Sequence, residues 1–219
     1  MRIIAGKIKG LELSEAGGMA HPMGERVRNS LFNSLGEKIL AAKVVDVCAG
    51  TGAVGLEAIS RGAAEVILIE KEPKMQEILR KNVKKAEEGL VRQEPDLRGR
   101  LQVWAGLAEK VLTKIDECDI IIVDAPYAQY ENGEFLAKIG KISEKILKKA
   151  GVLVVSAPKA LEVEGFDLVK LKKHAGAVLN FFEKILEEKS KQENTSKFTR
   201  RTNKPSKQNS PHRRYKQRP

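Results

Sequence analysis

The fold is decided by one stretch, Val44-Val45-Asp46-Val47-Cys48-Ala49-Gly50-Thr51-Gly52-Ala53-Val54-Gly55-Leu56-Glu57-Ala58-Ile59-Ser60-Arg61. Its apolar beginning predicts a buried strand, its glycines predict a turn, and its end predicts a helix. In such a unit the glycines let the backbone approach a ligand, and the helix N-terminus faces that ligand. Because further strands and helices alternate along the chain, we expect an α/β domain with a mostly parallel sheet.

An acidic residue ends the next predicted strand, residues 66–70. Glu70 has the spacing from the glycine turn at which a carboxylate can bind ribose hydroxyls. The pattern fits a dinucleotide dehydrogenase as well as an enzyme that uses S-adenosylmethionine. Asp46 favours S-adenosylmethionine, because it lies in the strand before the turn and can meet the charged amino-acid end of that cofactor. We therefore expect a cofactor site made of Asp46, Ala49, Gly50, Gly52 and Glu70.

A second functional signal is the apolar stretch of residues 119–123 with its tip, Asp124-Ala125-Pro126-Tyr127. Asp124 and the carbonyl oxygen of Ala125 can accept both N–H bonds of an exocyclic amine, which draws electron density onto its nitrogen. Tyr127 can stack on a flat base, and Pro126 stiffens the turn. The tip predicts methyl transfer to an amine of a base. It is also compatible with methylation of DNA amino groups or of protein glutamine, and with an ordinary loop.

Composition bounds the class of protein. With 219 residues, 42% of them hydrophobic, the chain can bury one main core. It has no apolar run of the about 18 residues that span a membrane, and its first residues lack a signal-peptide core. Cys48 and Cys118 are expected to pack as small hydrophobes, and the three histidines show no metal-ligand spacing. We therefore expect a cytoplasmic monomer that binds neither membrane nor metal.

Positive charge is concentrated at the C-terminus. Residues 190–219 contain ten Lys and Arg residues against Glu193 alone, in a chain of formal net charge +11. The segment has no aliphatic residue, so it cannot build a core and is expected to be disordered. Such a tail is typical of contact with a polyanion, with solubilisation as the alternative. The RNA-binding candidates in it are Arg200, Arg201, Arg213 and Arg214.

The chain divides into three predicted parts. Residues 1–37 form an N-terminal extension, with short strands at 2–6 and 9–13 and a helix from Glu25 to Leu35. Residues 38–187 form a Rossmann-like domain, and residues 188–219 form the basic tail. Within the domain we expect strands at 44–49, 66–70, 101–105, 120–123 and 152–156, helices at 73–88 and 135–149, and a closing antiparallel hairpin at 166–171 and 177–182.

Several blocks, in order over about residues 1–185, resemble one family. They are Met1-Arg2-Ile3-Ile4-Ala5-Gly6-Lys7, Glu25-Arg26-Val27-Arg28 with Leu31-Phe32-Asn33, Asp46-Val47-Cys48-Ala49-Gly50-Thr51-Gly52 with Gly55-Leu56-Glu57-Ala58 and Arg61-Gly62-Ala63, and the tip at 124–127. Together they are similar to the RsmD-type 16S ribosomal RNA guanine-N2 methyltransferases. The opening block and the Arg-Val-Arg block are specific to that family, whereas the glycine turn and the tip occur in many methyltransferases.

The resemblance implies a class I S-adenosylmethionine-dependent methyltransferase fold, with a seven-stranded, mostly parallel sheet whose last strand is antiparallel. It implies transfer of one methyl group to N2 of a guanine in small-subunit rRNA, with a small-subunit particle as the expected partner. It also implies that Leu107 faces the adenine of the cofactor, at a position where the family often has Asp or Asn. Further departures make the chain a divergent member, namely Ala125 for a proline, Ser156 for a glutamate, and His21-Pro22-Met23 for Arg-Pro-Thr.

Two arginines of the N-terminal extension are further candidates for RNA contact. Arg26 and Arg28 lie two positions apart on a predicted helix, so their side chains point about 200° apart. At most one of them can face RNA while the other turns inward. A non-catalytic RNA-binding assembly factor is the remaining alternative for the whole chain, because the departures from the family pattern touch both halves of the site.

Overall fold

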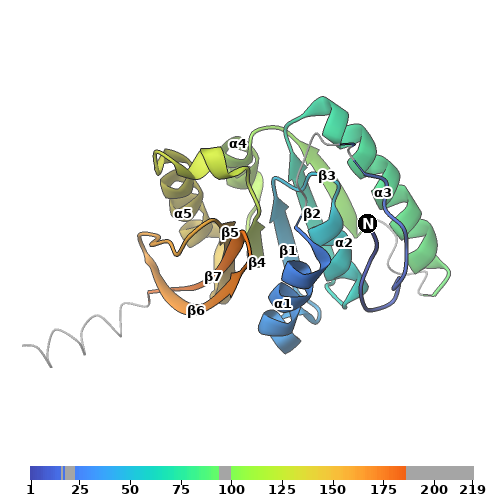
Figure 1. Ribbon diagram of the computed structural model, residues 1–219, viewed down its shortest axis with the longest axis horizontal. Helices are drawn as coiled ribbons and strands as arrows, with labels where there is room; N and C mark the ends of the chain where they lie inside the picture. Colours follow the sequence, from blue (N-terminus) through green and yellow to red (C-terminus); the bar gives the residue numbers. More distant parts are fainter. Residues whose placement is uncertain (16, 18–22, 94–99, 186–219) are drawn as a thin grey trace, which may run out of the picture. The chain divides into compact units, whose positions relative to one another are not determined.

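The computed structural model describes residues 1–15, 17, 23–93 and 100–185. Its seven-stranded sheet has the order β3-β2-β1-β4-β5-β7-β6 (Figure 1). The first five strands of the chain pair in parallel, β3 with β2, β2 with β1, β1 with β4 and β4 with β5. β7 is antiparallel to both of its neighbours, β5 and β6. This confirms the predicted sheet. The strands are β1 (Lys43–Val47), β2 (Glu65–Glu70), β3 (Leu101–Ala105), β4 (Cys118–Val123), β5 (Leu147–Ala157), β6 (Phe166–His174) and β7 (Ala177–Lys184).

Helices cover both faces of the sheet. One hydrophobic cluster unites the sheet with α1 (Glu25–Leu35), α2 (Ala53–Ser60) and α3 (Pro73–Val91), and a second unites it with α4 (Ala108–Val111) and α5 (Glu134–Ile146). The side chains of β4 alternate between them, with Ile120 and Ile122 in the first cluster and Ile121 and Val123 in the second. A central strand buried on both faces needs an unbroken apolar run, which is why residues 120–123 of β4 are all aliphatic. Short 3-10 turns occupy Gly36–Ile39, Leu112–Lys114 and Tyr127–Tyr130.

The junction between α5 and β5 differs from the prediction. The helix was expected to continue to Lys149, but it ends at Ile146, and β5 begins at Leu147 rather than at Val152. Leu147 pairs with Cys118, and the register between these two strands then shifts before Ile120. Lys148, Lys149 and Ala150 lie in this irregularity and are exposed. Because the two lysines interrupt the apolar pattern of the strand, the sequence predicted a helix end there.

The N-terminal segment is less regular than predicted. In place of two strands at 2–6 and 9–13, the structure has a single antiparallel bridge between Arg2 and Glu12. The backbone N–H groups of Ile4 and Ala5 instead donate to the carboxylate of Glu57 on α2, at 2.8 and 3.0 Å. A strand cannot continue where its donors are used by a side chain of another element. Ile3, Ile8 and Leu13 nevertheless belong to the same hydrophobic cluster as α1, α2 and the sheet.

Met1–Lys184 form one compact unit, distinct from Ile185–Pro219. The predicted tail, residues 188–219, lies outside the described residues, as do His21 and Pro22. Among the helices that the structure describes, none is both long enough and apolar enough to span a membrane.

Candidate cofactor and acceptor site

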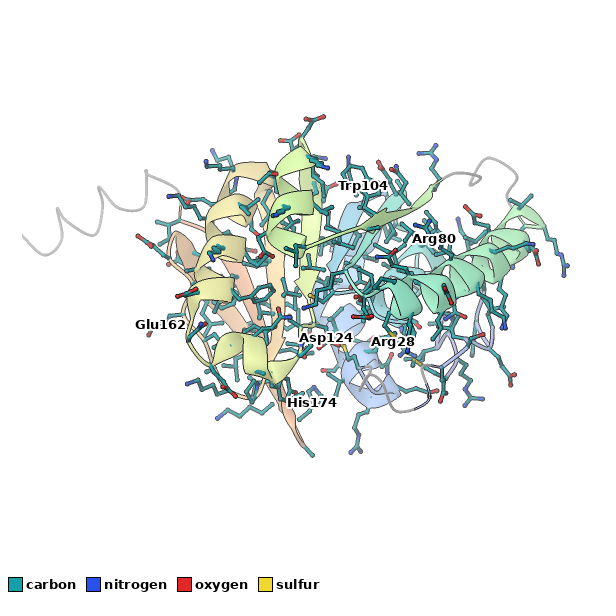
Figure 2. All side chains as sticks on the ribbon, turned by 90° about the horizontal axis from the view of Figure 1, so that it is seen from above. Arg28, Arg80, Trp104, Asp124, Glu162 and His174 are labelled. Carbon is teal, nitrogen blue, oxygen red and sulfur yellow. The ribbon has the colours of Figure 1, made fainter. Side chains whose placement is uncertain are left out.

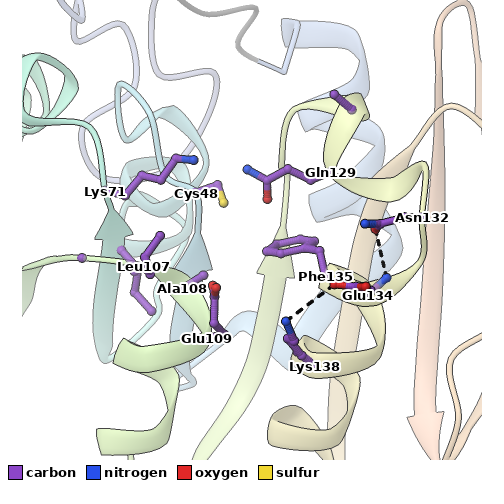
Figure 3. A pocket seen from close by; sticks show the side chains of 13 residues that line it. Cys48, Lys71, Leu107, Ala108, Glu109, Gln129, Asn132, Glu134, Phe135 and Lys138 are labelled. Atoms are coloured by element: carbon purple, nitrogen blue, oxygen red, sulfur yellow. Dashed lines mark hydrogen bonds and ion pairs between the residues drawn. The ribbon is translucent and has the colours of Figure 1, made fainter.

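A cleft of about 310 Å³ opens where β1, β2 and β3 end (Figure 3). Ligands of open α/β sheets bind at this edge, outside the carboxyl ends of the strands. Leu107, which the sequence predicts to face the adenine of the cofactor, lies on its wall and is 40% exposed. The other lining residues were not predicted as site residues; they include Cys48, Lys71, Ala108, Glu109, Gln129 and Phe135.

The glycine turn adopts backbone conformations that side chains disfavour. Gly50 has φ 55° and Gly52 has φ 83°, both in the left-handed region. Gly52 precedes the first residue of α2, and a Cβ atom there would lie 2.5 Å from Cδ1 of Leu79 on α3. The glycine therefore allows side chains of β2, α2 and α3 to pack closely against the loop.

Glu70 ends β2 and is held by the backbone around it. Its Oε2 atom accepts a hydrogen bond from the N–H of Gly50 at 2.8 Å. Its Oε1 atom accepts from the N–H groups of Lys71 and Glu72 at 2.8 and 2.9 Å. The carboxylate thus connects the glycine turn to the end of β2. Because Oε1 already accepts two hydrogen bonds and Oε2 only one, Oε2 keeps a lone pair for a further donor.

Asp46 is more deeply buried than its predicted role required. Its side chain is 1% exposed, and its Oδ2 atom accepts a hydrogen bond from Gly55 N–H at 2.8 Å. Burial raises the pKa of this carboxyl to about 8, the Gly55 N–H lowers it, and the charges of Asp124 and Glu70 raise it further. Asp46 therefore holds α2 against β1. At neutral pH the raised pKa leaves Asp46 largely protonated, and the charges of Glu70 and Asp124 make this side of the site electronegative, which suits a cation and disfavours a pyrophosphate.

The tip after β4 brings Asp124 together with groups from two other segments. Burial raises the pKa of Asp124 to about 6, while hydrogen bonds from the Ser156 hydroxyl and the Met23 backbone N–H lower it. Ser156 ends β5 in place of the family's glutamate, and it supports Asp124 as a donor. Met23 belongs to the segment that precedes α1. Neither contact could be predicted from the sequence, because both partners are distant from Asp124 along the chain.

Ala125 and Tyr127 each have a partner that the sequence did not predict. The N–H of Ala125, which a proline would lack, donates to the hydroxyl of Tyr130 at 3.3 Å. Tyr130 is buried and packs edge-on against Phe135 on the cofactor side of the site. The hydroxyl of Tyr127 donates to the carbonyl oxygen of Gly176 in the turn between β6 and β7, while the side chain remains 42% exposed.

The structure corrects the prediction for Arg28. Its side chain is fully buried, its Nε lies 3.5 Å from the Glu57 carboxylate, and its Nη1 donates to the carbonyl oxygen of Met23 at 3.1 Å. Burial lowers the pKa of this guanidinium, and the charge of Glu57 opposes that shift. Arg28 therefore fastens the Met23 segment to α2 and cannot contact RNA. Arg26, on the other face of α1, is exposed. The tail candidates Arg200, Arg201, Arg213 and Arg214 lie outside the described residues.

In this sheet a glycine turn follows β1, an acid ends β2 and an Asp-x-Pro-Tyr tip follows β4. The strand order and these three features define a class I S-adenosylmethionine-dependent methyltransferase. The family model described as "Conserved hypothetical protein 95" matches residues 1–183. The chain therefore belongs to that family, which is the RsmD-type family that its sequence resembles.

Individual relatives agree with this assignment. The protein named "Putative rRNA methyltransferase YlbH" of Bacillus subtilis (strain 168) is 28% identical over 168 residues, 74% of this chain and 85% of the relative. "Ribosomal RNA small subunit methyltransferase D" of Buchnera aphidicola subsp. Acyrthosiphon pisum is 30% identical over 162 residues, 69% of this chain and 81% of the relative. The solved structure "Putative methyltransferase yhhF from Escherichia coli" superposes with a TM-score of 0.69 at 26% identity, over 84% of this chain and 97% of that one.

Proposed function

We propose that this protein transfers a methyl group from S-adenosylmethionine to the exocyclic N2 amine of a guanine in small-subunit rRNA. The observation that carries the proposal is the Asp124 carboxylate, held at the strand tip by Ser156 and Met23 beside the electronegative cofactor side. Membership of the RsmD-type family and the names of its relatives support rRNA as the substrate. An rRNA substrate agrees with the cytoplasmic location expected from the sequence.

The cofactor side fits S-adenosylmethionine better than a dinucleotide. When bound, this cofactor supplies an electrophilic methyl group on a cationic sulfonium. Burial is the main cause of the raised pKa of Asp46, and repulsion from Asp124 and Glu70 adds to it; the positive charge of the cofactor would relieve that repulsion. The free lone pair on Oε2 of Glu70 would accept from a ribose hydroxyl, and the Gly50 and Gly52 backbone would hold the methionine end. Leu107 and Phe135 would flank the adenine.

On the acceptor side, Asp124 would act as a hydrogen-bond acceptor for the guanine amine. Its pKa of about 6 leaves it ionised at neutral pH. Asp124 and the carbonyl oxygen of Ala125 would hold the two amine hydrogens, so that the nitrogen lone pair is directed at the methyl group. The proton that the amine loses after methylation would pass to Asp124 or to water. Much of the rate enhancement would come from this placement of two bound reactants.

The target guanine must leave its stack to reach the tip, as base-modifying enzymes require. Tyr127 is suited to receive it, because its hydroxyl is anchored to Gly176 and its side chain is still 42% exposed. The tail arginines are proposed to add contacts to RNA phosphates independently of sequence. Deletion of residues 188–219 should therefore lower the salt dependence of RNA binding and leave turnover at saturating RNA unchanged.

The test compares small-subunit rRNA from cells with and without this protein by mass spectrometry of its nucleosides. Loss of one N2-methylguanine, restored by the wild-type protein and not by Asp124→Asn, is the expected result. Purified protein incubated with naked rRNA and with small-subunit particles then identifies the form of the substrate. A methylated glutamine or DNA base, with unchanged rRNA, would overturn the proposed acceptor. Cofactor binding without any methylated product would favour an assembly factor.

A further inference from the structure

A second hollow, a groove of about 790 Å³, lies between α1 and β6 and outside the cofactor cleft. One wall is the exposed side of α1, and the other is the second half of β6 with the residue after it. The lining residues contain no carboxylate. Most of them are basic or carry amide or hydroxyl groups, among them Arg26, Asn29, Asn33, Lys170, Lys172 and Lys173.

Most of the basic side chains of the groove form no ion pair with the described residues. Arg26, Lys172 and Lys173 are exposed, and within the described part of the chain none of them forms an ion pair. Lys170 instead forms a hydrogen bond, in which its Nζ donates to the carbonyl oxygen of Ser34 at 3.1 Å and so joins the two walls. The wall also contains the buried Nε2 atom of His174, which has no hydrogen-bond partner among the described residues. Folded proteins seldom leave such an atom unpaired.

Both walls begin at the tip that carries Asp124. The Met23 N–H donates to Asp124, and α1 starts two residues later at Glu25. The Tyr127 hydroxyl donates to Gly176, two residues after the end of β6 at His174. Figure 2 labels Asp124 and His174 in the same part of the molecule. An RNA strand that places one base at the tip would therefore have its neighbouring nucleotides next to the groove.

We propose that the α1–β6 groove binds the sugar-phosphate backbone of the RNA that flanks the target nucleotide. This inference rests on the proposed function and adds where the substrate lies. Each phosphate next to an extruded base carries a negative charge, and the electronegative cofactor side repels it. The groove is the neighbouring surface with the opposite charge, and its amide side chains Asn29 and Asn33 add neutral donors for phosphate and ribose oxygens.

Lysine on an edge strand has a more ordinary explanation, because it prevents sheets of different molecules from joining. That explanation covers β6 alone. It does not account for Arg26 and the amide side chains of α1 on the facing wall, or for the absence of carboxylates from the lining. The two explanations predict different behaviour when the charge is removed.

The experiment uses the full chain with the double substitution Lys172→Ala and Lys173→Ala. The matched control is Lys141→Ala with Lys145→Ala, two exposed lysines of α5 on the opposite side of the sheet. Binding of small-subunit rRNA is measured from low to moderate salt, with cofactor affinity, melting temperature and the methylation KM and kcat. The groove variant should lower the log–log salt slope by about 0.7–0.9 for each lost phosphate contact and raise KM about tenfold, with kcat and cofactor affinity unchanged.

Equal losses in the groove and control variants would overturn the proposal, because general positive charge would then explain RNA binding. An unchanged slope in the groove variant would overturn it as well. If the groove held a protein of the small subunit, activity would fall on assembled particles and naked-RNA binding would not change. If the wild-type protein binds rRNA but methylates none, the proposed function fails, and the slopes still test the groove.

Discussion

The cofactor cleft and the α1–β6 groove lie on two sides of one strand tip and differ in charge and in burial. On the cofactor side, Asp46 and Glu70 are buried carboxylates fixed by backbone N–H groups. In the groove the charged groups are exposed, and all of them are cations. A cationic cofactor and a polyanionic RNA need opposite surroundings. The tip separates them, so that each reactant is attracted to its own side.

The two regions also differ in how the chain builds them. The glycine turn and Glu70 come from one short strand–turn–helix–strand unit, so that local sequence places them. The groove joins α1 to β6, which are far apart in the sequence. Arg28 links these regions, because it pairs with Glu57 behind the glycine turn and holds the carbonyl of Met23, whose N–H reaches Asp124.

The largest expected effect is at the tip where the two regions meet. Asp124→Asn should lower the methylation rate by about 10²–10⁴-fold, the range for loss of a positioned acid–base group, while cofactor affinity changes by no more than a few-fold. Because the pKa of Asp124 is about 6, the wild-type rate should also fall as pH drops through 6. Single-turnover kinetics and calorimetry check this. Near-wild-type turnover in Asp124→Asn would remove Asp124 from the mechanism.

Arg28→Met should break the link between the regions and destabilise the fold by about 3 kcal/mol, the lower end for a broken buried ion pair, since Arg61 still neutralises Glu57. The matched control is Arg26→Met, two positions away and exposed, which should change stability by no more than about 0.5 kcal/mol. Denaturant unfolding measures both. The opposite ranking, or lost RNA affinity with unchanged stability in Arg28→Met, would restore Arg28 as an RNA contact.

Glu70→Ala tests the cofactor side alone. Loss of the charge-assisted bonds to a ribose should weaken S-adenosylmethionine binding by about 1.5–3 kcal/mol. The melting temperature should also fall, because Glu70 accepts N–H groups of Gly50, Lys71 and Glu72. Glu70→Gln should lose less on both measures, since it keeps one acceptor. Calorimetry that finds equal cofactor affinity for Glu70→Ala and wild type would exclude the ribose contact.

The charge of the cofactor side should appear as a pH dependence. Asp46 has its pKa raised from 3.8 to about 8, and a bound cation favours its ionised form. Cofactor affinity should therefore increase as pH rises, by up to about tenfold per unit below pH 8, and level off above it. The free energy of unfolding of the cofactor-free protein should fall as pH rises from about 4 to 8, because the folded state holds the proton of Asp46 more tightly than the unfolded state does. In Asp46→Asn, which can still accept from Gly55, calorimetry across this range should find a flatter curve.

The smallest expected effect concerns the bond that compensates for the family's missing proline. Tyr130→Phe removes the acceptor of the Ala125 N–H and should cost about 0.5–1.5 kcal/mol. Ala125→Pro removes the donor instead, so it should also cost stability. In the Tyr130→Phe background the proline should cost less than it does alone. Thermal unfolding of the two single variants and the double variant measures this coupling, and simple additivity would argue against it.

The sequence alone determined the parts that local physics controls. Periodicity gave α1 its bounds, Glu25–Leu35, and β3 its bounds, Leu101–Ala105, as the structure has them. Glycine placed the turn before α2, and the closing hairpin was recognisable from two apolar runs separated by a turn. These features depend on residues within a few positions of each other, so the interacting partners are adjacent in the sequence and can be recognised there.

Tertiary structure decided the contacts between distant segments. The sequence left open which of Arg26 and Arg28 turns inward, because the carboxylate that makes the burial of Arg28 tolerable, Glu57, comes from another helix. Likewise, only the folded chain brings the Ser156 hydroxyl and the Met23 N–H to Asp124, and Lys172 opposite Arg26. A buried charge or a bound polyanion requires partners in space, and their distance along the chain leaves no periodic signal.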